Sequence, residues 1–420
     1  MGSRSWDRDE LMNLLYLLYA FMLPLSRAGV SLFTVLILLL FLLDPRRKAY
    51  MTELWKMPAA KWILVFVGYY FLSPLLTVRY GQSVEQWREQ LRYLLPYLDL
   101  LPAVVIAVTL KKQYLVRLLY AFLAGMFVSE IFSYLIFFEI WEKKRTLVSV
   151  SNPTPFMHHI QYSTFLALTA LLLLDKLVKE AHKGYRLFSL SFLLMTVGTL
   201  FLINGRTGQV AFLAGLFVLA FVQFRNKFKA LVISMLLAVL VIGAAYTLSE
   251  NFRERVQVAQ SDIVSMLEKN DYQTSLGYRV GVTILSAPLI REHPLLGTGV
   301  VRTMHLIREE ARVRFPNDHW LDRSNHLQNQ YLQVLVETGM IGLGILLMLF
   351  YNIGKIPLHS ENCRNLKVIF LTVYLLSMFS DIQLHIQFTA GFFALIVGLL
   401  LACARTEEEE SVPMEVEVHG

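Results

Sequence analysis

The sequence predicts an all-α protein that crosses a lipid membrane many times. Of its 420 residues, 55% are hydrophobic and only 17% are charged, and the mean hydropathy is +0.50. Apolar runs repeatedly approach the roughly 20 residues that a helix needs to cross a hydrocarbon core. These runs are continuous and do not alternate between apolar and polar positions, which argues against a transmembrane β-barrel. The chain is therefore expected to be a polytopic helical membrane protein.

Twelve apolar segments are candidate membrane spans, although the first two are short and are joined tightly at Arg27. The spans are expected at residues 11–26, 28–43, 62–79, 91–110, 114–140, 157–175, 187–204, 208–223, 228–247, 331–352, 366–384 and 388–404. These spans divide the chain into four parts. In chain order, the parts are nine spans within residues 1–247, a long polar loop at 248–330, three spans within 331–404, and an acidic tail at 405–420.

The basic residues indicate how these spans are oriented. The formal net charge is +7, but lysines and arginines are scattered through short loops between apolar segments, so a nucleic-acid partner is not expected. They concentrate on one side of the membrane, in loops at residues 44–61, 111–117, 176–186, 225–229 and 355–367. Cytoplasmic loops carry such an excess of Lys and Arg. We therefore expect both termini in the cytoplasm, with the acidic tail solvated and disordered, and the long loop on the outer side.

The long outer loop is unusual both in its length and in its cations. Polar segments of this length are usually functional or form small domains, and residues 252–269 and 277–290 have helix-like patterns. Apart from Lys269, the cations of the loop are arginines. The planar guanidinium group binds phosphate oxygens in pairs better than an ammonium group does. The loop is thus a candidate for binding a phosphorylated ligand, with an ordinary solvated surface as the alternative.

Two arginines stand in motifs that set them apart. Arg206 lies in the turn Asn-Gly-Arg-Thr-Gly at residues 204–208, between two apolar segments on the outer side. The small residues of this turn allow a partner to approach the backbone closely. The alternative is an interfacial arginine that reaches the lipid headgroups. Arg279 opens a helix-like run in the long loop, which ends in a Pro- and Gly-containing turn at residues 293–299.

A row of polar side chains leads into the apolar segment at residues 340–350. Successive residues of a helix differ by 100°, so four polar residues fall on one stripe if the helix begins as early as position 326. They are His326, Gln330, Gln333 and Glu337. Gln328 then points away, but the inference fails if the helix begins nearer Asn329. Polar side chains at the edge of a membrane are costly unless they line a cavity or site; the alternative is a stripe of hydrogen bonds that packs helices together.

No metal site or nucleotide-binding motif is evident from the spacing. His158 and His159 open the sixth span on the outer side, but adjacent helical side chains diverge by about 100°, so they cannot easily share one ion. His, Cys, Asp and Glu show no convincing metal-ligand spacing, and there is no P-loop, Rossmann fingerprint or nucleophile elbow. Cys363 and Cys403 lie outside the long loop and suggest no disulfide framework.

Together these motifs resemble those of the O-antigen ligase and O-antigen polymerase family of bacterial envelope membrane proteins. The first is the small-residue turn with an arginine at 204–208. The second is Gly277-Tyr278-Arg279, followed by the run "HPLLGxG" at 293–299. The third is residues 329–342, which match the signature "HNxYLxxLxExGxxG" from its second position onward. Each motif alone is weak, but their order and their shared outer side make the set specific.

The sequence departs from this family pattern at one position. The family's histidine falls at position 328, where this chain has Gln328. Family members often carry "HxHN", and His326 matches the first histidine of that pattern. Either His326 takes over the role of the family histidine, or that histidine is dispensable or lost in this chain.

The resemblance implies a GT-C-like fold and a metal-independent, inverting glycosyl transfer on the periplasmic face of the bacterial inner membrane. The donor would be a glycan (O-antigen) on undecaprenyl diphosphate, the acceptor would be lipid A–core, and no cofactor is implied. An O-antigen polymerase and a protein O-oligosaccharyltransferase of the same family are the alternatives. A transporter is a further alternative, but its polar sites are expected near the middle of the membrane within inverted repeats, and neither feature is evident.

The resemblance also implies roles for individual residues. Arg206 and Arg279 would stabilise the diphosphate by fixed charge and paired hydrogen bonds, and His326 would accept the proton of the acceptor hydroxyl. Asp318 and Asp322 are alternative bases. The glutamate of the signature would orient the imidazole or hold its helix. The other residues expected at the site are Arg88 and His159 for the donor, and Gln328, Asn329, Gln330 and Glu337 as supporting groups.

Overall fold

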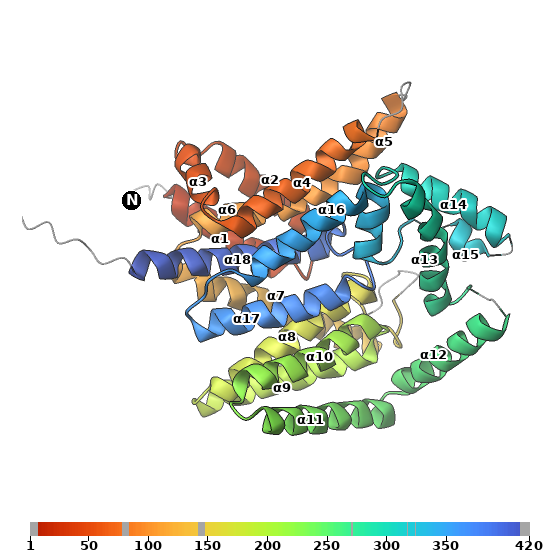
Figure 1. Cartoon of the computed structure of the whole chain (residues 1–420). Coiled ribbons are helices and arrows are strands. Elements are labelled where there is room, and N and C mark those ends of the chain that lie inside the picture. Colours follow the sequence, from red (N-terminus) through yellow and green to blue (C-terminus); the bar gives the residue numbers. More distant parts are fainter. Residues whose placement is uncertain are drawn as a thin grey trace, which may run out of the picture.

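The computed structural model describes residues 7–77, 84–141, 148–269, 272–316, 318–323 and 325–411. Within these residues the chain forms helices joined by loops, with one isolated β-bridge between Ser149 and Asn152. Most helices run side by side as a bundle, and a group of helices from residues 250–322 covers one end of it (Figure 1). We call this covered end the loop end. The opposite end, where the first helix begins and the last helix ends, is called the terminal end.

The helices follow one another along the whole chain. The first part contains α1 (Arg8–Met22), α2 (Arg27–Leu42), α3 (Arg47–Leu54), α4 (Pro58–Leu76), α5 (Val84–Leu94), η1 (Leu95–Leu100), α6 (Pro102–Thr109), η2 (Lys112–Tyr114) and α7 (Leu115–Phe137). The second part contains α8 (His159–Lys179), α9 (Lys183–Leu202), α10 (Arg206–Gln223) and α11 (Lys227–Leu248). The loop end is formed by α12 (Glu250–Lys269), α13 (Ser275–Glu292), α14 (Arg302–Arg314) and α15 (His319–Asp322). The chain finishes with α16 (Gln330–Gly354), α17 (Glu361–Ser377) and α18 (Gln387–Ser411).

Nine helices of the described residues are long and apolar enough to cross a membrane. Each of the twelve predicted spans corresponds to a helix or a broken helix, but α1, α2 and α17 have only 15, 16 and 17 residues. At a rise of about 1.5 Å per residue such helices are shorter than a hydrocarbon core of about 30 Å. The pair α2 and α3, bent by 106°, is a tenth candidate. The class of polytopic helical membrane protein is confirmed, while the number twelve stays a prediction.

The predicted span at residues 91–110 is not one regular helix. It consists of the end of α5, the 3₁₀ helix η1 and α6, which together count as one candidate span. Pro96 and Pro102 stand in the first turns of η1 and α6. Proline has no N–H group and clashes with the preceding turn, so it is tolerated at the start of a helix and interrupts one that continues through it.

The predicted polar loop at residues 248–330 is mostly helical. After the break at Ser249, α12 follows α11 directly, and α13, α14 and α15 pack around a small apolar core of their own. That core includes Val282, Ile307 and Leu321, which are fully buried, together with Leu327 and Val336 from the chain that enters α16. Apolar burial therefore fixes the helices of the loop end against α16.

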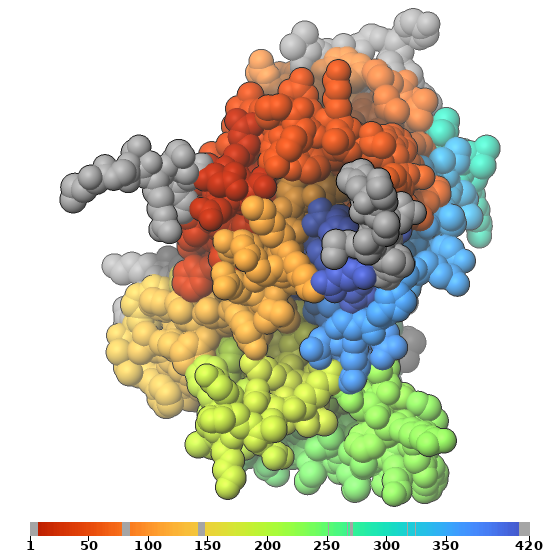
Figure 2. Space-filling view, turned by 90° about the vertical axis from the view of Figure 1, so that its left-hand side faces the viewer, coloured from red at the N-terminus to blue at the C-terminus, as the bar shows by residue number. Residues whose placement is uncertain are grey.

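The last helix, α18, lies at the centre of the bundle and packs against α6, η1 and α2. From Ala390 to Cys403 nearly every described side chain is buried. A helix that is apolar on all sides must be covered on all sides. Figure 2 shows the terminal end, where α18 (blue) emerges between the N-terminal helices (red and orange) and the helices of residues 180–230 (yellow to green).

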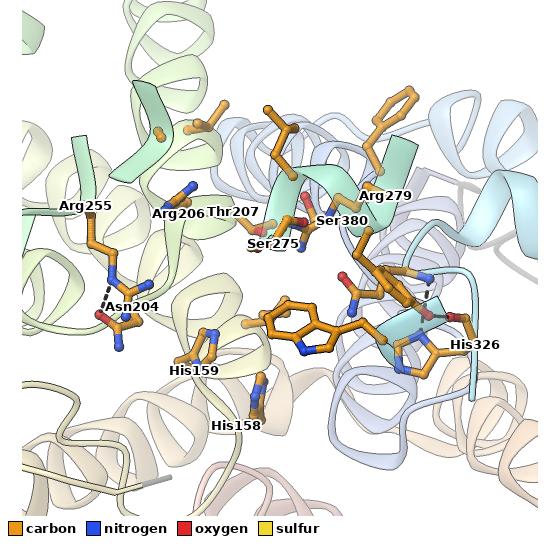
Figure 3. A pocket seen from close by; sticks show the side chains of 18 of the residues that line it. His158, His159, Asn204, Arg206, Thr207, Arg255, Ser275, Arg279, His326 and Ser380 are labelled. Carbon is orange, nitrogen blue, oxygen red and sulfur yellow. Dashed lines mark hydrogen bonds between the residues drawn. The ribbon is translucent and has the colours of Figure 1, made fainter. Parts of the chain in front are cut away.

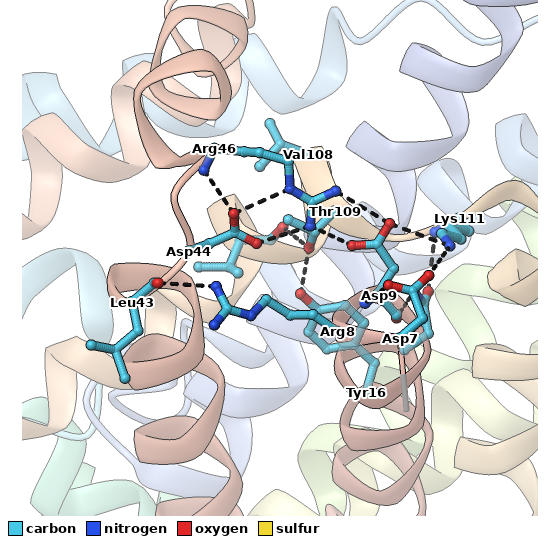
Figure 4. Close-up of polar contacts among 12 residues, drawn as sticks. Asp7, Arg8, Asp9, Tyr16, Leu43, Asp44, Arg46, Val108, Thr109 and Lys111 are labelled. Atoms are coloured by element: carbon cyan, nitrogen blue, oxygen red, sulfur yellow. Dashed lines mark hydrogen bonds and ion pairs between the residues drawn. The ribbon is translucent and has the colours of Figure 1, made fainter. Parts of the chain in front are cut away.

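A network of ion pairs ties the helices together at the terminal end (Figure 4). The guanidinium group of Arg46 contacts the carboxylates of Asp44, at 2.9 Å, and Asp9. Lys111 reaches Asp9 at 3.3 Å and Asp7 at 3.7 Å. The network thus joins the start of α1 to the turn between α2 and α3 and to the loop that follows α6.

The acidic tail differs from the prediction, because its first residues continue α18. The Glu407 carboxylate accepts hydrogen bonds from the backbone N–H groups of His359, at 2.6 Å, and Ser360, at 3.0 Å, next to the start of α17. Anionic groups are favoured at the N-terminal end of a helix, where backbone N–H groups have no partner. Residues 405–411 are therefore helical, and residues 412–420 lie outside the described residues.

Candidate active site

A cavity of about 1250 Å³ lies at the loop end, between the ends of several membrane helices and the α12–α15 segment (Figure 3). It is strongly cationic, because four arginines and four histidines line it and, among the described residues, no Asp or Glu does. Its polar lining consists of His158, His159, Asn204, Arg206, Thr207, Arg255, Gln273, Ser275, Tyr278, Arg279, His319, Arg323, Asn325, His326, Gln328 and Ser380. The cavity therefore joins two predicted arginines and the predicted histidine in one place.

The turn at residues 204–208 places Arg206 at the first position of α10. Its glycines allow α10 to lie directly on α8, because a Cβ atom at Gly208 would be 2.1 Å from the backbone oxygen of Ser163. The N–H group of Gly208 also donates to the Ser163 hydroxyl at 3.1 Å. The Arg206 side chain lines the cavity, and its Nη2 atom is buried without a hydrogen-bond partner among the described residues. Both the charge and the helix N-terminus favour an anion here.

Arg279 reaches the same cavity from α13, whose start is capped by the Thr274 hydroxyl. Its Nη1 atom donates to the backbone oxygen of Ser275 at 2.9 Å and to the Ser275 hydroxyl at 3.0 Å. Its Nε atom is buried and has no partner among the described residues. Burial lowers the pKa of the Arg279 guanidinium, and the nearby charge of Arg206 adds to this effect, while Asp381 opposes it.

Arg255 is a third cavity arginine, which sequence reasoning did not single out. It projects from α12, and its Nε atom donates to the side-chain oxygen of Asn204 at 3.0 Å (Figure 3). Burial and the charge of Arg206 lower the pKa of the Arg255 guanidinium. The only signal in the sequence was that the long loop contains arginines rather than lysines, and this signal did not distinguish Arg255 from its neighbours.

The residues around His326 are not helical, so the condition for the helical-wheel inference is not met. The helix α16 begins at Gln330 with Asn329 as its N-cap, and Gln328 has a φ of +48°. The Asn329 side chain accepts a hydrogen bond from the N–H group of Leu332 at 3.1 Å. In this loop conformation both His326 and Gln328 line the cavity. The helix thus has the later of the two starts considered, for which the inference that Gln328 points away does not hold.

The His326 ring is placed by contacts on both sides. Its backbone oxygen accepts a hydrogen bond from the Tyr278 hydroxyl at 2.7 Å, and its Nδ1 atom accepts one from the N–H group of Gln328 at 3.2 Å. Nδ1 is also 3.7 Å from the Oδ1 atom of Asp381. Asp381 is 2% exposed and binds the side chain of Gln161 at 2.9 Å. Asp381 was not among the residues expected at the site, although a single carboxylate near the end of an apolar run was a usable signal.

The other members of the polar stripe are buried behind the cavity and do not line it. The carboxylate of Glu337 accepts hydrogen bonds from the side chain of Gln333, at 2.7 Å, and from the hydroxyls of Tyr70, at 3.2 Å, and Tyr93. The side-chain oxygen of Gln333 in turn accepts the N–H group of Leu327 at 2.7 Å. Of the two roles expected for Glu337, the geometry favours holding the helix and the loop, because Glu337 does not contact the imidazole.

Gln330 is fully buried as well, and it joins α16 to the loop between α17 and α18. Its side-chain oxygen accepts a hydrogen bond from the N–H group of Leu384 at 2.9 Å, and its backbone N–H group donates to the backbone oxygen of Met378 at 2.8 Å. This loop carries Asp381. The two hydrogen bonds of Gln330 therefore fix the position of the loop that carries Asp381 relative to the segment that carries His326.

The Pro- and Gly-containing turn at residues 293–299 docks onto a break in α16, and we call this contact the clasp. The N–H groups of Thr298 and Gly299 donate to the backbone oxygens of Val336, at 2.8 Å, and Glu337, at 3.0 Å. In the other direction, the N–H group of Met340 donates to the oxygen of Pro294 at 2.8 Å. The break lies at Gly339, where φ is +68°. Two of the sequence motifs are thus bonded to each other, and the clasp fixes α13 to α16.

Four further predicted residues take different positions. His159 lines the cavity, stacks on His158 with ring centroids 3.9 Å apart, and has a buried Nδ1 atom without a partner among the described residues. Arg88 lies on the exposed helix α5 and is not among the cavity residues. Asp318 caps α15 through the N–H groups that follow it, and Asp322 pairs with Arg312 at 2.6 Å. Neither aspartate lines the cavity, so the structure does not support either as the base.

The described residues contain no group of three or more His, Cys, Asp and Glu side chains that could hold a metal ion. The fold and the cavity define the class as a polytopic membrane protein with a cationic site at one end of its helix bundle. Residues 190–347 match the family model described as O-antigen ligase, and this match supports an assignment to the O-antigen ligase family. The match includes Arg206, Arg279, His326 and the clasp, and it confirms the resemblance noted in the sequence motifs.

One relative is a protein of Haemophilus influenzae whose description is "Uncharacterized protein". It is 29% identical over 223 residues, which is 50% of this chain and 55% of the relative, so the match spans about half of each protein.

Proposed function

We propose that this protein is an inverting, metal-independent glycosyltransferase that moves a glycan from undecaprenyl diphosphate to lipid A–core. The reaction would take place on the periplasmic face of the inner membrane. The observation that carries the proposal is the cavity at the loop end, which is lined by arginines and histidines and, among the described residues, by no carboxylate. A site of this kind favours an anionic group held near the ends of the membrane helices.

The donor diphosphate would bind between Arg206 and Arg279. A diphosphate that carries a lipid on one phosphate and a sugar on the other has two negative charges. Arg206 Nη2, Arg279 Nε and His159 Nδ1 are buried and have no partner among the described residues. Because a buried polar group without a partner is costly, phosphate oxygens that bind these guanidinium groups would remove an unfavourable feature of the free protein. Fixed guanidinium groups would then supply the charge stabilisation that some transferases obtain from a metal ion.

The lipid tail would leave the cavity on its apolar side. Val210 on α10 and Phe379 after α17 line the cavity and are 59% and 57% exposed. Leu376, on the last turn of α17, lines the cavity as well. Val210 and Leu376 lie close to the ends of their helices, so an isoprenoid chain that leaves the cavity beside these side chains would enter the lipid.

The acceptor hydroxyl would be activated by His326. Its oxygen attacks the anomeric carbon, the bond between that carbon and the phosphate oxygen breaks, and the lipid diphosphate leaves with the electron pair. The hydroxyl proton passes to Nε2 of His326. A neutral imidazole has one N–H donor and one acceptor nitrogen, so Nε2 accepts a proton only when Nδ1 carries one. In the structure Nδ1 accepts a hydrogen bond from the N–H group of Gln328 at 3.2 Å, which corresponds to the tautomer with the proton on Nε2. We propose that the ring takes the other tautomer when substrate binds, with the Nδ1–H group donating to Asp381, 3.7 Å away, so that Nε2 is free to accept the hydroxyl proton.

The test is reconstitution of the purified protein in liposomes with a glycan on undecaprenyl diphosphate. Lipid A–core, a second copy of the glycan donor, and an unglycosylated acceptor protein would be offered separately, with and without EDTA. We expect transfer to lipid A–core that is insensitive to EDTA. Product on the second glycan would instead identify a polymerase, and product on the protein a protein glycosyltransferase.

The variant Arg279→Ala should abolish transfer, while the chain still inserts into the membrane. Arg291→Ala is the matched control, because Arg291 lies on the same helix, is exposed, and does not line the cavity. Wild-type rates in Arg279→Ala would overturn the assignment of this cavity as the active site.

A further inference from the structure

We propose that Arg255 is a third ligand of the donor diphosphate, and that it acts mainly on the negative charge that appears as the glycosidic bond breaks. This inference rests on the proposed transfer reaction and assigns a further residue to it. Arg255 comes from α12, whereas Arg206 and Arg279 come from α10 and α13. The three side chains line one cavity from three different helices.

The position of Arg255 is fixed by the same turn that carries Arg206. Its Nε atom donates to the Asn204 side-chain oxygen at 3.0 Å. The backbone N–H group of Asn204 donates in turn to the side-chain oxygen of Asn152 at 3.1 Å. Because Nε is used in this way, the two terminal nitrogens of the guanidinium group remain for a ligand, and no hydrogen bond joins them to the described residues.

The placement of Arg255 is electrostatically unfavourable without an anion. It is half-buried on α12, and no carboxylate of the described residues forms an ion pair with it or lines the cavity. Burial and the charge of Arg206 lower the pKa of Arg255, although the carboxylates of Glu254 and Asp262 oppose this effect. Arg206 is close enough to lower the pKa of both Arg255 and Arg279. Like charges in a partly buried site repel each other more strongly than in water. A ligand that brings negative charge between these groups removes this repulsion.

The negative charge at the site increases during the reaction, and this increase distinguishes the role of Arg255 from that of Arg206 and Arg279. The donor diphosphate carries two negative charges, because each phosphorus has one ionised oxygen. When the bond from the anomeric carbon to the phosphate oxygen breaks, that oxygen keeps the electron pair and becomes a third negative charge on the released lipid diphosphate. The acceptor's proton goes to His326, so it does not neutralise the leaving group. Of the four cavity arginines, Arg323 is exposed to solvent. Arg206 and Arg279 match the two charges of the bound donor, and Arg255 supplies a third positive charge for the leaving group.

An interaction that is stronger in the transition state than in the bound donor raises kcat more than it changes KM. Loss of Arg255 should therefore lower kcat about 10- to 100-fold, the range expected for one hydrogen bond to a charged group, with little change in the KM for the donor. The released undecaprenyl diphosphate should also bind more weakly by a similar factor. Undecaprenyl monophosphate, which lacks the second phosphate, should be affected less.

The experiment compares Arg255→Ala and Arg255→Lys with the matched control Arg253→Ala. Arg253 lies on the same helix, is exposed, and does not line the cavity. Transfer kinetics and binding of undecaprenyl diphosphate and undecaprenyl monophosphate would be measured in the same detergent-solubilised proteins. We expect Arg253→Ala to behave as wild type and Arg255→Lys to recover part of the loss, since lysine keeps the charge but cannot bind Asn204 and a phosphate as a planar fork does.

Equal binding of undecaprenyl diphosphate by wild type and Arg255→Ala would overturn the inference, as would a loss confined to KM. The thermal unfolding of the Lys variant shows whether any loss reflects misfolding. If the wild type transfers no glycan to any acceptor, the proposed function fails, and the binding comparison still decides whether Arg255 is a diphosphate ligand.

Discussion

Substitution of Gly339 by alanine should open the clasp and thereby displace the two halves of the site. Gly339 has φ +68° and ψ −167° within α16, a conformation that is almost exclusive to glycine and costs another residue about 1–3 kcal/mol. A Cβ atom here would lie 2.2 Å from the backbone carbon and oxygen of Leu295. Since the obstruction is backbone, it cannot be relieved by rotating a side chain.

The cost of this substitution can be estimated from the bonds that would break. If the turn at 293–299 moves away, the hydrogen bonds from Met340 to Pro294, at 2.8 Å, and from Ile341 to Leu295, at 3.3 Å, are lost first. Each is worth about 0.5–1.5 kcal/mol. Together with the backbone strain, we expect a destabilisation of about 2–6 kcal/mol. Arg279 would lose its fixed position relative to His326, so the transfer rate should fall even in protein that remains folded.

The assay is thermal unfolding of the detergent-solubilised protein, followed by transfer kinetics at a temperature where the variant is folded. Gly344→Ala is the matched control, because Gly344 lies on the same helix and an added Cβ there meets nothing within 4 Å. We expect the control to retain wild-type stability or to gain slightly from better helix propensity. An unfolding temperature and a rate for Gly339→Ala that equal those of the control would refute the clasp as a positioning element.

Four further predictions follow from contacts of the site. His326→Ala should reduce transfer far more than Gln328→Ala, measured as initial rates; the reverse order would show that position 328 holds the important group. Asp381→Asn should lower kcat about 10- to 100-fold with little effect on donor KM, because an amide stabilises the imidazolium less than a carboxylate does; an unchanged kcat would remove Asp381 from the mechanism. Glu337→Gln should lower the unfolding temperature more than it lowers kcat/KM at low temperature, which circular dichroism and rate measurements can separate. Burial lowers the pKa of His385 to about 4. Because the folded state holds this imidazole neutral, the stabilisation from its burial is present above pH 6.5 and is lost as the pH falls towards 4. In His385→Gln the unfolding temperature should therefore fall less than in the wild type over this pH range.

Local patterns in the sequence were enough to predict most of the membrane helices. Continuous apolar runs specify a spanning helix wherever they occur, since no water is available to bond an irregular backbone. The pattern was less informative where prolines intervene, as in η1 and α6, and where a polar segment folds on a small core, as in α13 to α15. It was misleading at residues 326–329, because a stripe on a helical wheel has meaning only where the chain is helical, and Gln328 adopts a positive φ.

The sequence also pointed to Arg206, Arg279 and His326, because each stands beside residues with a distinctive pattern of glycine, proline or amide groups. It could not give a role to the clasp glycines, to Arg255 or to Asp381, since each acts through a partner far away in the chain. Gly339 meets Leu295, Arg255 meets Asn204, and Asp381 faces His326.

By itself, then, the sequence determined that this protein is a helical membrane protein with arginine motifs beside its apolar segments, because hydrophobicity and turn chemistry act over a few neighbouring residues. Only the tertiary structure decided which of these side chains share one cavity, which no carboxylate of the described residues lines, and which of them lie behind it. The reason is that packing between α8, α10, α13 and α16 sets distances between segments that no local pattern constrains.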